Sequence, residues 1–267
     1  MARSLALARQ IQQQLLPQNQ PRLQGFDIHG GGVFSDETGG DYYDFLPLDD
    51  KNEQLGLVVG DVSGHGVGAA LLMASARGVL RSQAGHDESD LAKLFEVLNR
   101  HLESDTDSER YMTLFFGILD TTASSLTWCS AGHGPIFHFC QRRQSFTELP
   151  STGIPLGIFE DAVYIVEKPL FLEQGDLLLA GTDGIWETCS SSGEAFGLER
   201  FREVIRKHRC EKAAKIHAAV LESLTAFRGE APQEDDVTLI VVKMQDESQH
   251  PVTRVSENSE YSASSEE

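Results

Sequence analysis

The order in which strand-like and helix-like segments follow one another restricts the fold of this chain more than any other feature. Strand patterns occupy residues 25–61 and two helical patterns follow; a long series of strand patterns then leads to two more helices and one last strand. Strands do not alternate regularly with helices, as they would in a doubly wound parallel sheet. The sequence therefore predicts an α+β fold in which largely antiparallel sheets carry helices on their outer faces.

The expected strands are apolar runs that alternate with polar residues or lie between turn signals. Phe26 and Ile28 alternate with polar residues, and Leu55–Gly60 is a continuous apolar run that ends at Asp61. Val237–Met244 is the last expected strand. The other expected strands are Met112–Leu119, Ser125–Cys129, Ile136–Cys140, Val163–Leu170 and Leu177–Gly181.

Apolar residues at three- and four-residue spacing predict the helices. Arg3–Leu16 is the first, ended by Pro17. Residues 1–20 are interpreted either as a helix packed on the domain or as a connector or dimer helix, and both readings stay open. Ser89 is a plausible N-cap for a later helix. The remaining expected helices cover Gly66–Gln83, the stripe from Leu91 to Leu102, Leu198–His208 and Lys212–Phe227.

Composition is that of an ordinary globular protein. The 267 residues can bury the core of one large domain or two small ones, and 40% of them are hydrophobic. The longest apolar runs, such as Leu177–Ala180, are too short to span a bilayer, and the N-terminus lacks the pattern of a signal peptide. The four cysteines show no CxxC spacing and are interpreted as free thiols of a cytoplasmic protein.

The formal charge of −19 restricts the partners. Nucleic acid and anionic membrane surfaces are disfavoured because their own negative charge would be repelled. Phosphate binding by the bare protein is disfavoured for the same reason. A phosphate site in this chain would therefore need bound cations to invert the local field.

Four acidic positions lie where strand-like runs begin or end. Asp41 follows two glycines, Asp61 ends an apolar run, Asp183 follows another, and Asp235 with Asp236 precedes the last strand. Each alone has an ordinary reading as a turn residue or a strand-end cap. Four such positions together indicate one cluster of carboxylates, which repel one another unless cations fill it. The pattern predicts a hard-metal site for phosphate chemistry.

These motifs resemble those of SpoIIE/RsbU-type bacterial serine/threonine phosphatases, members of the metal-dependent (PPM, type 2C) superfamily. The resemblance covers about Ile11 to Met244, with the motifs in family order. The residues that carry it are Gln13–Pro17, Gly39–Asp44, Asp61–Gly66, Ala131–His133, Pro155–Gly157, Gly175–Leu179, Thr182–Gly184 and Asp235–Thr238.

The resemblance implies a four-layer α-β-β-α sandwich of two mainly antiparallel sheets for residues 21–245. Residues 246–267 are expected to form an acidic disordered tail. The family mapping assigns one metal to Asp41 and Asp61, helped by the main-chain carbonyl of Val62. Asp61 also bridges to a second metal, which Asp183 and Asp235 complete. All-oxygen ligands favour two Mn²⁺ or Mg²⁺ ions.

Four other residues have weaker assignments. Asp236 is the less favoured ligand of its pair, because the family's aligned position is the first of the two. Asp44 is considered as a residue supporting the ligands. His65 is a candidate general acid at an unusual offset from Asp61, and His133 is interpreted as structural rather than catalytic.

The resemblance implies an enzyme that releases phosphate from phosphoserine or phosphothreonine by two-metal activation of water. Its expected substrate is a signalling protein such as a STAS-type anti-sigma-factor antagonist. Further partners are a regulatory sensor or receiver protein and a second copy of the chain. No lysine or arginine lies between Arg22 and Asp41, so the residue that contacts the phosphate is not named. The alternative is a pseudophosphatase, a partner-binding module without catalysis; a GGDEF-type cyclase explains only one of the motifs.

Overall fold

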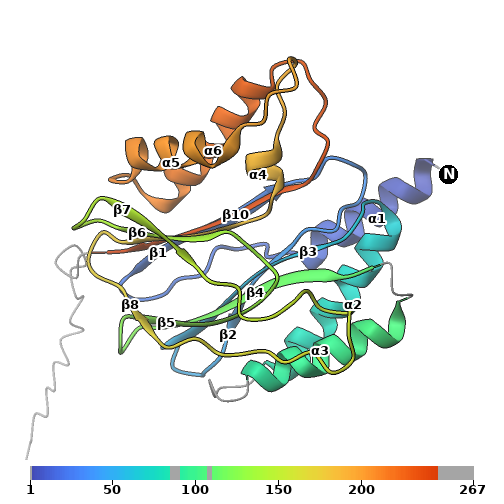
Figure 1. The fold of residues 1–267 in the computed structure, drawn as a ribbon, viewed down its shortest axis with the longest axis horizontal. Coiled ribbons are helices and arrows are strands. Elements are labelled where there is room, and N and C mark those ends of the chain that lie inside the picture. Colours follow the sequence, from blue (N-terminus) through green and yellow to red (C-terminus); the bar gives the residue numbers. More distant parts are fainter. Residues whose placement is uncertain (1, 85–90, 107–109, 246–267) are drawn as a thin grey trace, which may run out of the picture.

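Two five-stranded sheets pack face to face in the computed structural model, which describes residues 2–84, 91–106 and 110–245 (Figure 1). All neighbouring strands pair antiparallel. The first sheet has the order β1 (Phe26–Val33), β10 (Val237–Met244), β9 (Leu177–Gly181), β6 (Ile136–Cys140) and β7 (Ser145–Leu149). The second has the order β2 (Tyr42–Pro47), β3 (Gln54–Val62), β4 (Met112–Asp120), β5 (Ser125–Ala131) and β8 (Leu170–Phe171).

Helices cover the outer faces of both sheets. Figure 1 shows α5 and α6 over the first sheet and α2 and α3 over the second, which confirms the predicted four-layer sandwich. The helices are α1 (Ala2–Leu15), α2 (Val67–Gln83), α3 (Leu91–Asp105), α4 (Gly184–Glu187), α5 (Gly197–His208) and α6 (Ala213–Arg228). Within the described residues, no helix has the length and apolar character needed to cross a membrane.

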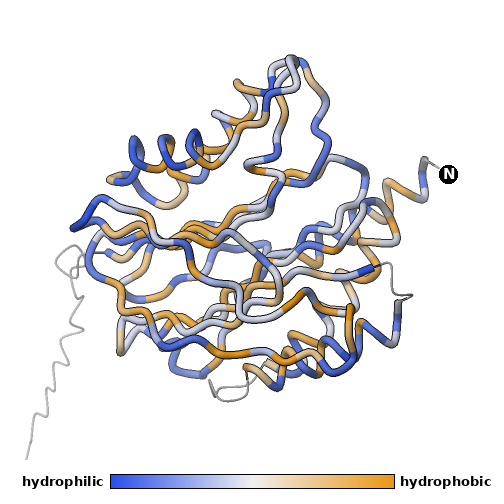
Figure 2. Tube along the Cα trace, in the orientation of Figure 1, coloured by the Kyte–Doolittle hydropathy of each residue, from blue (hydrophilic) through white to orange (hydrophobic). Residues whose placement is uncertain are grey.

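The hydrophobic core forms three layers, one between the sheets and one beneath each helical face. Strand β10 is continuously apolar because both of its faces lie in the core. Val241 faces α5 and α6, whereas Ile240 and Val242 face the other sheet. Figure 2 shows hydrophobic residues along these central strands, while α5 alternates between hydrophobic and hydrophilic residues around its turns. Each fully buried side chain of this kind contributes about 1.5–3 kcal/mol to folding.

Most of the sequence-based elements are found, and one expected strand is wrong. Strand β10 has the predicted bounds, whereas Val163–Leu170 forms no regular strand and only the short β8 begins at its end. Val163 and Ile165 are 72% and 61% exposed. Pro169 has no N–H to donate to a ladder, so the apolar alternation in this segment is not matched by strand pairing. The sequence reading also missed β7 and the single-turn helix α4.

Helix α1 forms where the spacing predicts it, but its buried residue is polar. Ile11 is 52% exposed, whereas Gln12 is only 4% exposed. The Gln12 side-chain amide donates to the Gly39 carbonyl over 2.7 Å, and its carbonyl oxygen accepts from the Gly39 N–H over 3.1 Å. The role of α1 as a connector or dimer helix stays a prediction. The proposed N-cap Ser89 and the tail 246–267 lie outside the described residues.

Candidate metal centre

Four strand ends meet at one edge of the sandwich and carry the four aspartates. Asp41 precedes β2 and Asp61 lies near the end of β3, and these strands pair antiparallel. Asp183 follows β9 and Asp235 precedes β10, which also pair antiparallel. The start of one antiparallel strand lies beside the end of its neighbour. Each sheet therefore contributes two carboxylates to the same edge.

A hydrogen-bonded threonine joins the two sheets at this edge. The Thr182 hydroxyl donates to Asp41 Oδ2 over 2.8 Å and accepts from the Thr238 N–H over 3.0 Å. Asp41 is 2% exposed and Thr182 is 1% exposed. The contact fixes the orientation of a buried carboxylate of the second sheet by a residue of the first.

Close backbone approach at this edge requires glycine. A Cβ on Gly40 would lie 2.5 Å from the carbonyl oxygen of Val62, and one on Gly184 would lie 1.9 Å from that of Asp236. Both distances are too short for non-bonded contact, so these glycines allow the strand ends to approach. The Val62 carbonyl proposed as a ligand therefore lies against the residue that precedes Asp41.

Replacing Gly184 with alanine is expected to destabilise the protein by about 1–3 kcal/mol, because a methyl group would press on the Asp236 backbone. Asp183 would be displaced with it, so Mn²⁺ binding is expected to weaken. Thermal unfolding and calorimetric Mn²⁺ titration measure the two effects. Gly78→Ala is the control: Gly78 is an exposed position of helix α2, where an added Cβ meets nothing within 4 Å. It should stabilise by about 0.5–1 kcal/mol. Equal stability of the two variants would contradict the prediction.

The electrostatics of the cluster are those of uncompensated negative charge. Burial, followed by the charges of Asp183, Asp235 and Asp236, raises the pKa of Asp61 to about 8. Burial, followed by the charges of Asp61 and Asp236, holds the pKa of Asp41 well above its usual range. The pKa of Asp235 is also raised, first by partial desolvation of its carboxylate and further by the charges of Asp183 and Asp236. No lysine or arginine in the described ranges forms an ion pair with the four proposed ligand aspartates.

This donor set fits hard divalent cations in its chemistry. Carboxylate and carbonyl oxygens are the ligands preferred by Mg²⁺ and Mn²⁺. A cation would also remove the mutual repulsion that raises the pKa of Asp61. Among the described residues, no three His, Cys, Asp or Glu side chains are arranged closely enough to hold an ion as they stand. The fit therefore rests on charge and ligand type, and the individual ligand assignments stay predictions.

Asp236 belongs to the cluster, although the sequence reading ranked it below Asp235. It is 5% exposed, and its Oδ1 accepts from the N–H and hydroxyl of Ser35 at 2.8 and 3.0 Å. Asp235 is exposed and accepts from the Asp236 N–H over 2.8 Å. Glu187, which the sequence reading missed, also lies nearby: burial, then Asp183 and Asp235, raise its pKa. A glutamate in a short helix carries no sequence signal of this kind.

Asp44 does not support the ligands as the sequence reading considered. Its carboxylate accepts from Arg81 of α2 at 2.7 Å through both oxygens, and from the Tyr42 hydroxyl at 2.7 Å. Side chains alternate along a strand, and Tyr42 packs in the core layer beneath α2 and α3. Asp44 therefore anchors a helix to β2 instead of facing the other aspartates.

His65 lies at the solvent-exposed rim of the site. Its Nδ1 is 2.9 Å from Asp36 Oδ2, and its side chain is 80% exposed. Its charge lowers the pKa of Asp235, as a minor cause beside burial. The contact with Asp36 would orient the ring, and the general-acid role of His65 stays a hypothesis.

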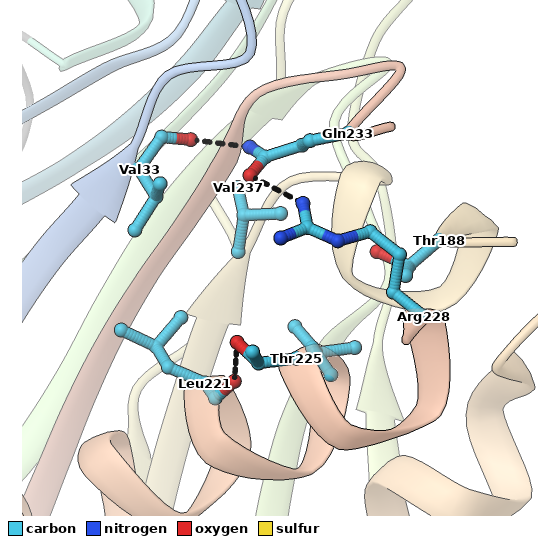
Figure 3. A pocket seen from close by; sticks show the side chains of 8 residues that line it. Val33, Thr188, Leu221, Thr225, Arg228, Gln233 and Val237 are labelled. Atoms are coloured by element: carbon cyan, nitrogen blue, oxygen red, sulfur yellow. Dashed lines mark hydrogen bonds between the residues drawn. The ribbon is translucent and has the colours of Figure 1, made fainter. Parts of the chain in front are cut away.

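Hydrogen bonds of Gln233 hold the loop that carries Asp235 against the end of β1 and against α6. Gln233 donates to the carbonyls of Val33 and Asp235 over 2.8 and 2.9 Å, and it accepts from Arg228 Nη1 over 2.9 Å. Arg228 and Gln233 line a small cavity of about 70 Å³, together with Val33 at the end of β1 and residues of α6. Figure 3 shows these side chains. A neighbouring cavity of about 220 Å³ is lined by Arg228, Asp235 and Gly184. It lies directly beside the carboxylate cluster.

A protein-family model matches most of the chain. The family described as stage II sporulation protein E (SpoIIE) matches residues 51–245. The matched residues include three of the four proposed ligand aspartates and omit Asp41. Phosphoserine phosphatase RsbU of Bacillus subtilis is 31% identical over 243 residues, which are 90% of this chain and 69% of RsbU.

Solved structures show the same fold. The SiaA-PP2C domain of Pseudomonas aeruginosa superposes with a TM-score of 0.77 at 24% identity, over 91% of this chain and 96% of that one. The RsbU and RsbW domains of Rv1364c from Mycobacterium tuberculosis give a TM-score of 0.69 at 31% identity. That match covers 84% of this chain and 61% of the other, so the chain spans only part of a longer relative.

Proposed function

We propose two-cation hydrolysis of phosphoserine or phosphothreonine as the activity of this chain, which belongs to the SpoIIE family of PP2C-type protein phosphatases. The observation that carries the mechanism is the clustering of Asp61 with three other aspartates at one edge of the sandwich, where burial and then the charges of Asp183, Asp235 and Asp236 raise the pKa of Asp61 to about 8. Like charges held together at a cost to the fold indicate a site built for cations.

The proposed ligands are those of the family mapping. Asp41, Asp61 and the Val62 carbonyl would hold one ion, and Asp61, Asp183 and Asp235 the other, with Mn²⁺ or Mg²⁺ as the occupants. Divalent cations bound there would supply an activated water and neutralise charge on the phosphoryl oxygens.

Neighbouring residues favour the ionised form of Asp41 and hold the main chain at Asp235. Hydrogen bonds from Thr182 and Thr238 lower the pKa of Asp41 and so oppose the effect of its burial, which favours the ionised form that a cation needs. Gln233 holds the main chain at Asp235. Together these contacts reduce the rearrangement that cation binding requires.

The proposed substrate is a phosphorylated signalling protein, with a STAS-type anti-sigma-factor antagonist as the leading candidate. Support comes from the RsbU relative, named a phosphoserine phosphatase, and from the structure that joins RsbU and RsbW domains in one chain. A regulatory sensor or receiver protein and a second copy of the chain are further proposed partners.

The test is phosphate release from a phosphoserine peptide with and without Mn²⁺. Wild type is expected to turn over only with the cation, and Asp183→Asn is expected to lose that turnover. Asp120→Asn is the matched control, because Asp120 is the last residue of β4, at the end of the strand farthest from the aspartate cluster. This variant should retain activity. Cation-independent turnover in wild type would contradict the two-cation mechanism.

The alternative is a pseudophosphatase that binds the same partner without catalysis. Four clustered carboxylates argue against it, since a binding surface gains nothing from their mutual repulsion. Wild-type protein that neither binds Mn²⁺ nor releases phosphate would favour this alternative. Mn²⁺ binding without turnover would indicate an enzyme that needs an activating partner.

A further inference from the structure

His133 contacts both sheets behind the carboxylate cluster. It lies in the turn between β5 and β6 and is 4% exposed. Its Nδ1 is 2.8 Å from the hydroxyl of Thr113. Thr113 is the residue of β4 that pairs directly with Asp61 of β3. One ring nitrogen of His133 is therefore linked to the strand pair that carries a proposed ligand.

The other ring nitrogen faces the opposite sheet. The carbonyl of Gly181 lies close enough to favour the protonated ring, as a minor cause beside burial. Nε2 is nevertheless buried without a hydrogen-bond partner of ordinary geometry. Gly181 ends β9, and Asp183 follows two residues later. The imidazole thus lies between the strand end near Asp183 and the strand beside Asp61.

The turn leaves the ring little freedom. The Ser130 hydroxyl donates to the His133 carbonyl over 2.8 Å. Gly132 has φ of +65°, and a Cβ there would lie 2.5 Å from the ring of Pro155. Only glycine suits this turn, because the positive φ and the short contact both exclude a larger residue. The backbone of His133 is held on both sides of the residue.

The imidazole of His133 is neutral and can hydrogen-bond through both of its nitrogens. Burial lowers the pKa of His133 to about 4, so the imidazole is uncharged near neutral pH. A neutral imidazole has one donor and one acceptor nitrogen. If the Thr113 hydroxyl donates to Nδ1, the proton lies on Nε2, on the side of the Gly181 carbonyl. This tautomer is assigned from the partners.

We propose that His133 is a positioning residue that sets the separation between the strand ends carrying Asp61 and Asp183, and thereby the affinity of the site for divalent cations. It touches neither substrate nor proposed ligands and acts through Thr113 and Gly181. The proposal rests on the proposed function, because it assumes a divalent-cation site at this edge.

The experiment measures Mn²⁺ affinity by calorimetric titration of the full chain, beside thermal unfolding of the metal-free protein. His133→Ala removes both contacts, His133→Asn can keep the one to Thr113, and His133→Gln can keep the one toward Gly181. Thr113→Val removes the partner of Nδ1 at a half-buried position with little change in shape. It tests the link if the histidine variants do not fold.

The matched control is His138→Gln. His138 is also 4% exposed, but its Nε2 pairs with Asp176 at 2.8 Å, at the end of β9 away from the cluster. This variant should unfold at a lower temperature and bind Mn²⁺ within roughly threefold of wild type. A merely structural histidine would behave in the same way.

His133→Ala is expected to weaken Mn²⁺ binding by roughly 10–100-fold, as loss of residues that orient ligands commonly does. Thr113→Val should weaken it in the same direction by less. Folded His133→Ala or Thr113→Val protein that binds Mn²⁺ like the His138 control would overturn the proposal while leaving the proposed function intact. Failure of wild type to bind Mn²⁺ would instead overturn the proposed function, and the positioning role with it.

Discussion

Replacing Asp61 with asparagine is expected to abolish phosphate release and, at the same time, to stabilise the metal-free protein. The first effect follows from its proposed place between the two ions, where loss of a shared ligand should lower turnover by at least about 10³-fold. The second follows from the removal of a half-buried carboxylate whose charge is disfavoured by desolvation and by three neighbouring carboxylates. If Asp61 instead contributed to stability, the asparagine variant would destabilise the metal-free protein.

The stabilisation has a defined pH window. Unfolded Asp61 titrates near its ordinary value of 3.8, and in the folded protein its pKa is about 8. Between these values the folded state holds a proton that the unfolded state has released, so wild-type stability falls as pH rises through the window. Below about pH 4 this contribution is fully present, and above pH 8 it is lost. A shift of about four pKa units, at about 1.4 kcal/mol per unit, makes the loss by pH 9 at most about 6 kcal/mol.

Urea unfolding of metal-free wild type and Asp61→Asn at pH 5, 7 and 9 measures this effect. The stability difference should favour the variant and widen with pH. Asp120→Asn serves as a control, because Asp120 lies at the opposite edge and its pKa is lowered rather than raised. A variant that is less stable than wild type at pH 9 would show that Asp61 is compensated in the fold.

Replacing Arg81 with methionine is expected to destabilise the protein by about 3–5 kcal/mol, the largest stability loss predicted for a residue outside the carboxylate cluster. Arg81 donates to both oxygens of Asp44, which is 0% exposed. Without Arg81, the nearest cation of that buried carboxylate is Arg77, at 4.0 Å. The anchor between α2 and β2 would be lost with it.

The double variant Arg81→Met with Asp44→Leu provides the sharp comparison. It removes both charges, so it should be more stable than Arg81→Met alone, although the Tyr42 hydroxyl then loses its acceptor. Arg142→Met is the surface control, because its pair with Glu173 is 71% and 55% exposed and should contribute less than about 1 kcal/mol. Chemical denaturation measures all three. Equal losses for Arg81→Met and Arg142→Met would mean that water compensates Asp44 in place of Arg81, whose side chain is 43% exposed.

Local sequence was enough to locate most elements and the proposed ligands. The bounds of β10 follow from eight residues of strand-forming character, and α5 and α6 from three- and four-residue spacing. The ligand aspartates could be found because each follows or precedes an apolar run. Side-chain periodicity and turn residues are local properties, so a single chain displays them without its partners.

The sequence-based predictions were wrong where the structure of a segment depends on its neighbours in the fold. The apolar alternation of Val163–Leu170 resembled a strand, but a strand also needs ladder partners, and Pro169 has no N–H to offer. Asp44 was read with Asp41 because the two are near in sequence. In the fold it faces α2, because residues of a strand alternate between faces.

The sequence by itself determined the types of element, the antiparallel class and the carboxylates at strand ends. Only the tertiary structure decided which carboxylates lie close enough to repel one another. The Asp41 carboxylate, for example, is hydrogen-bonded to Thr182, which lies 141 positions away in the sequence. It also placed His133 between the two sheets and Asp236 within the cluster. Pairing between sheets depends on how all strands pack together, and no local pattern records the neighbours that packing will supply.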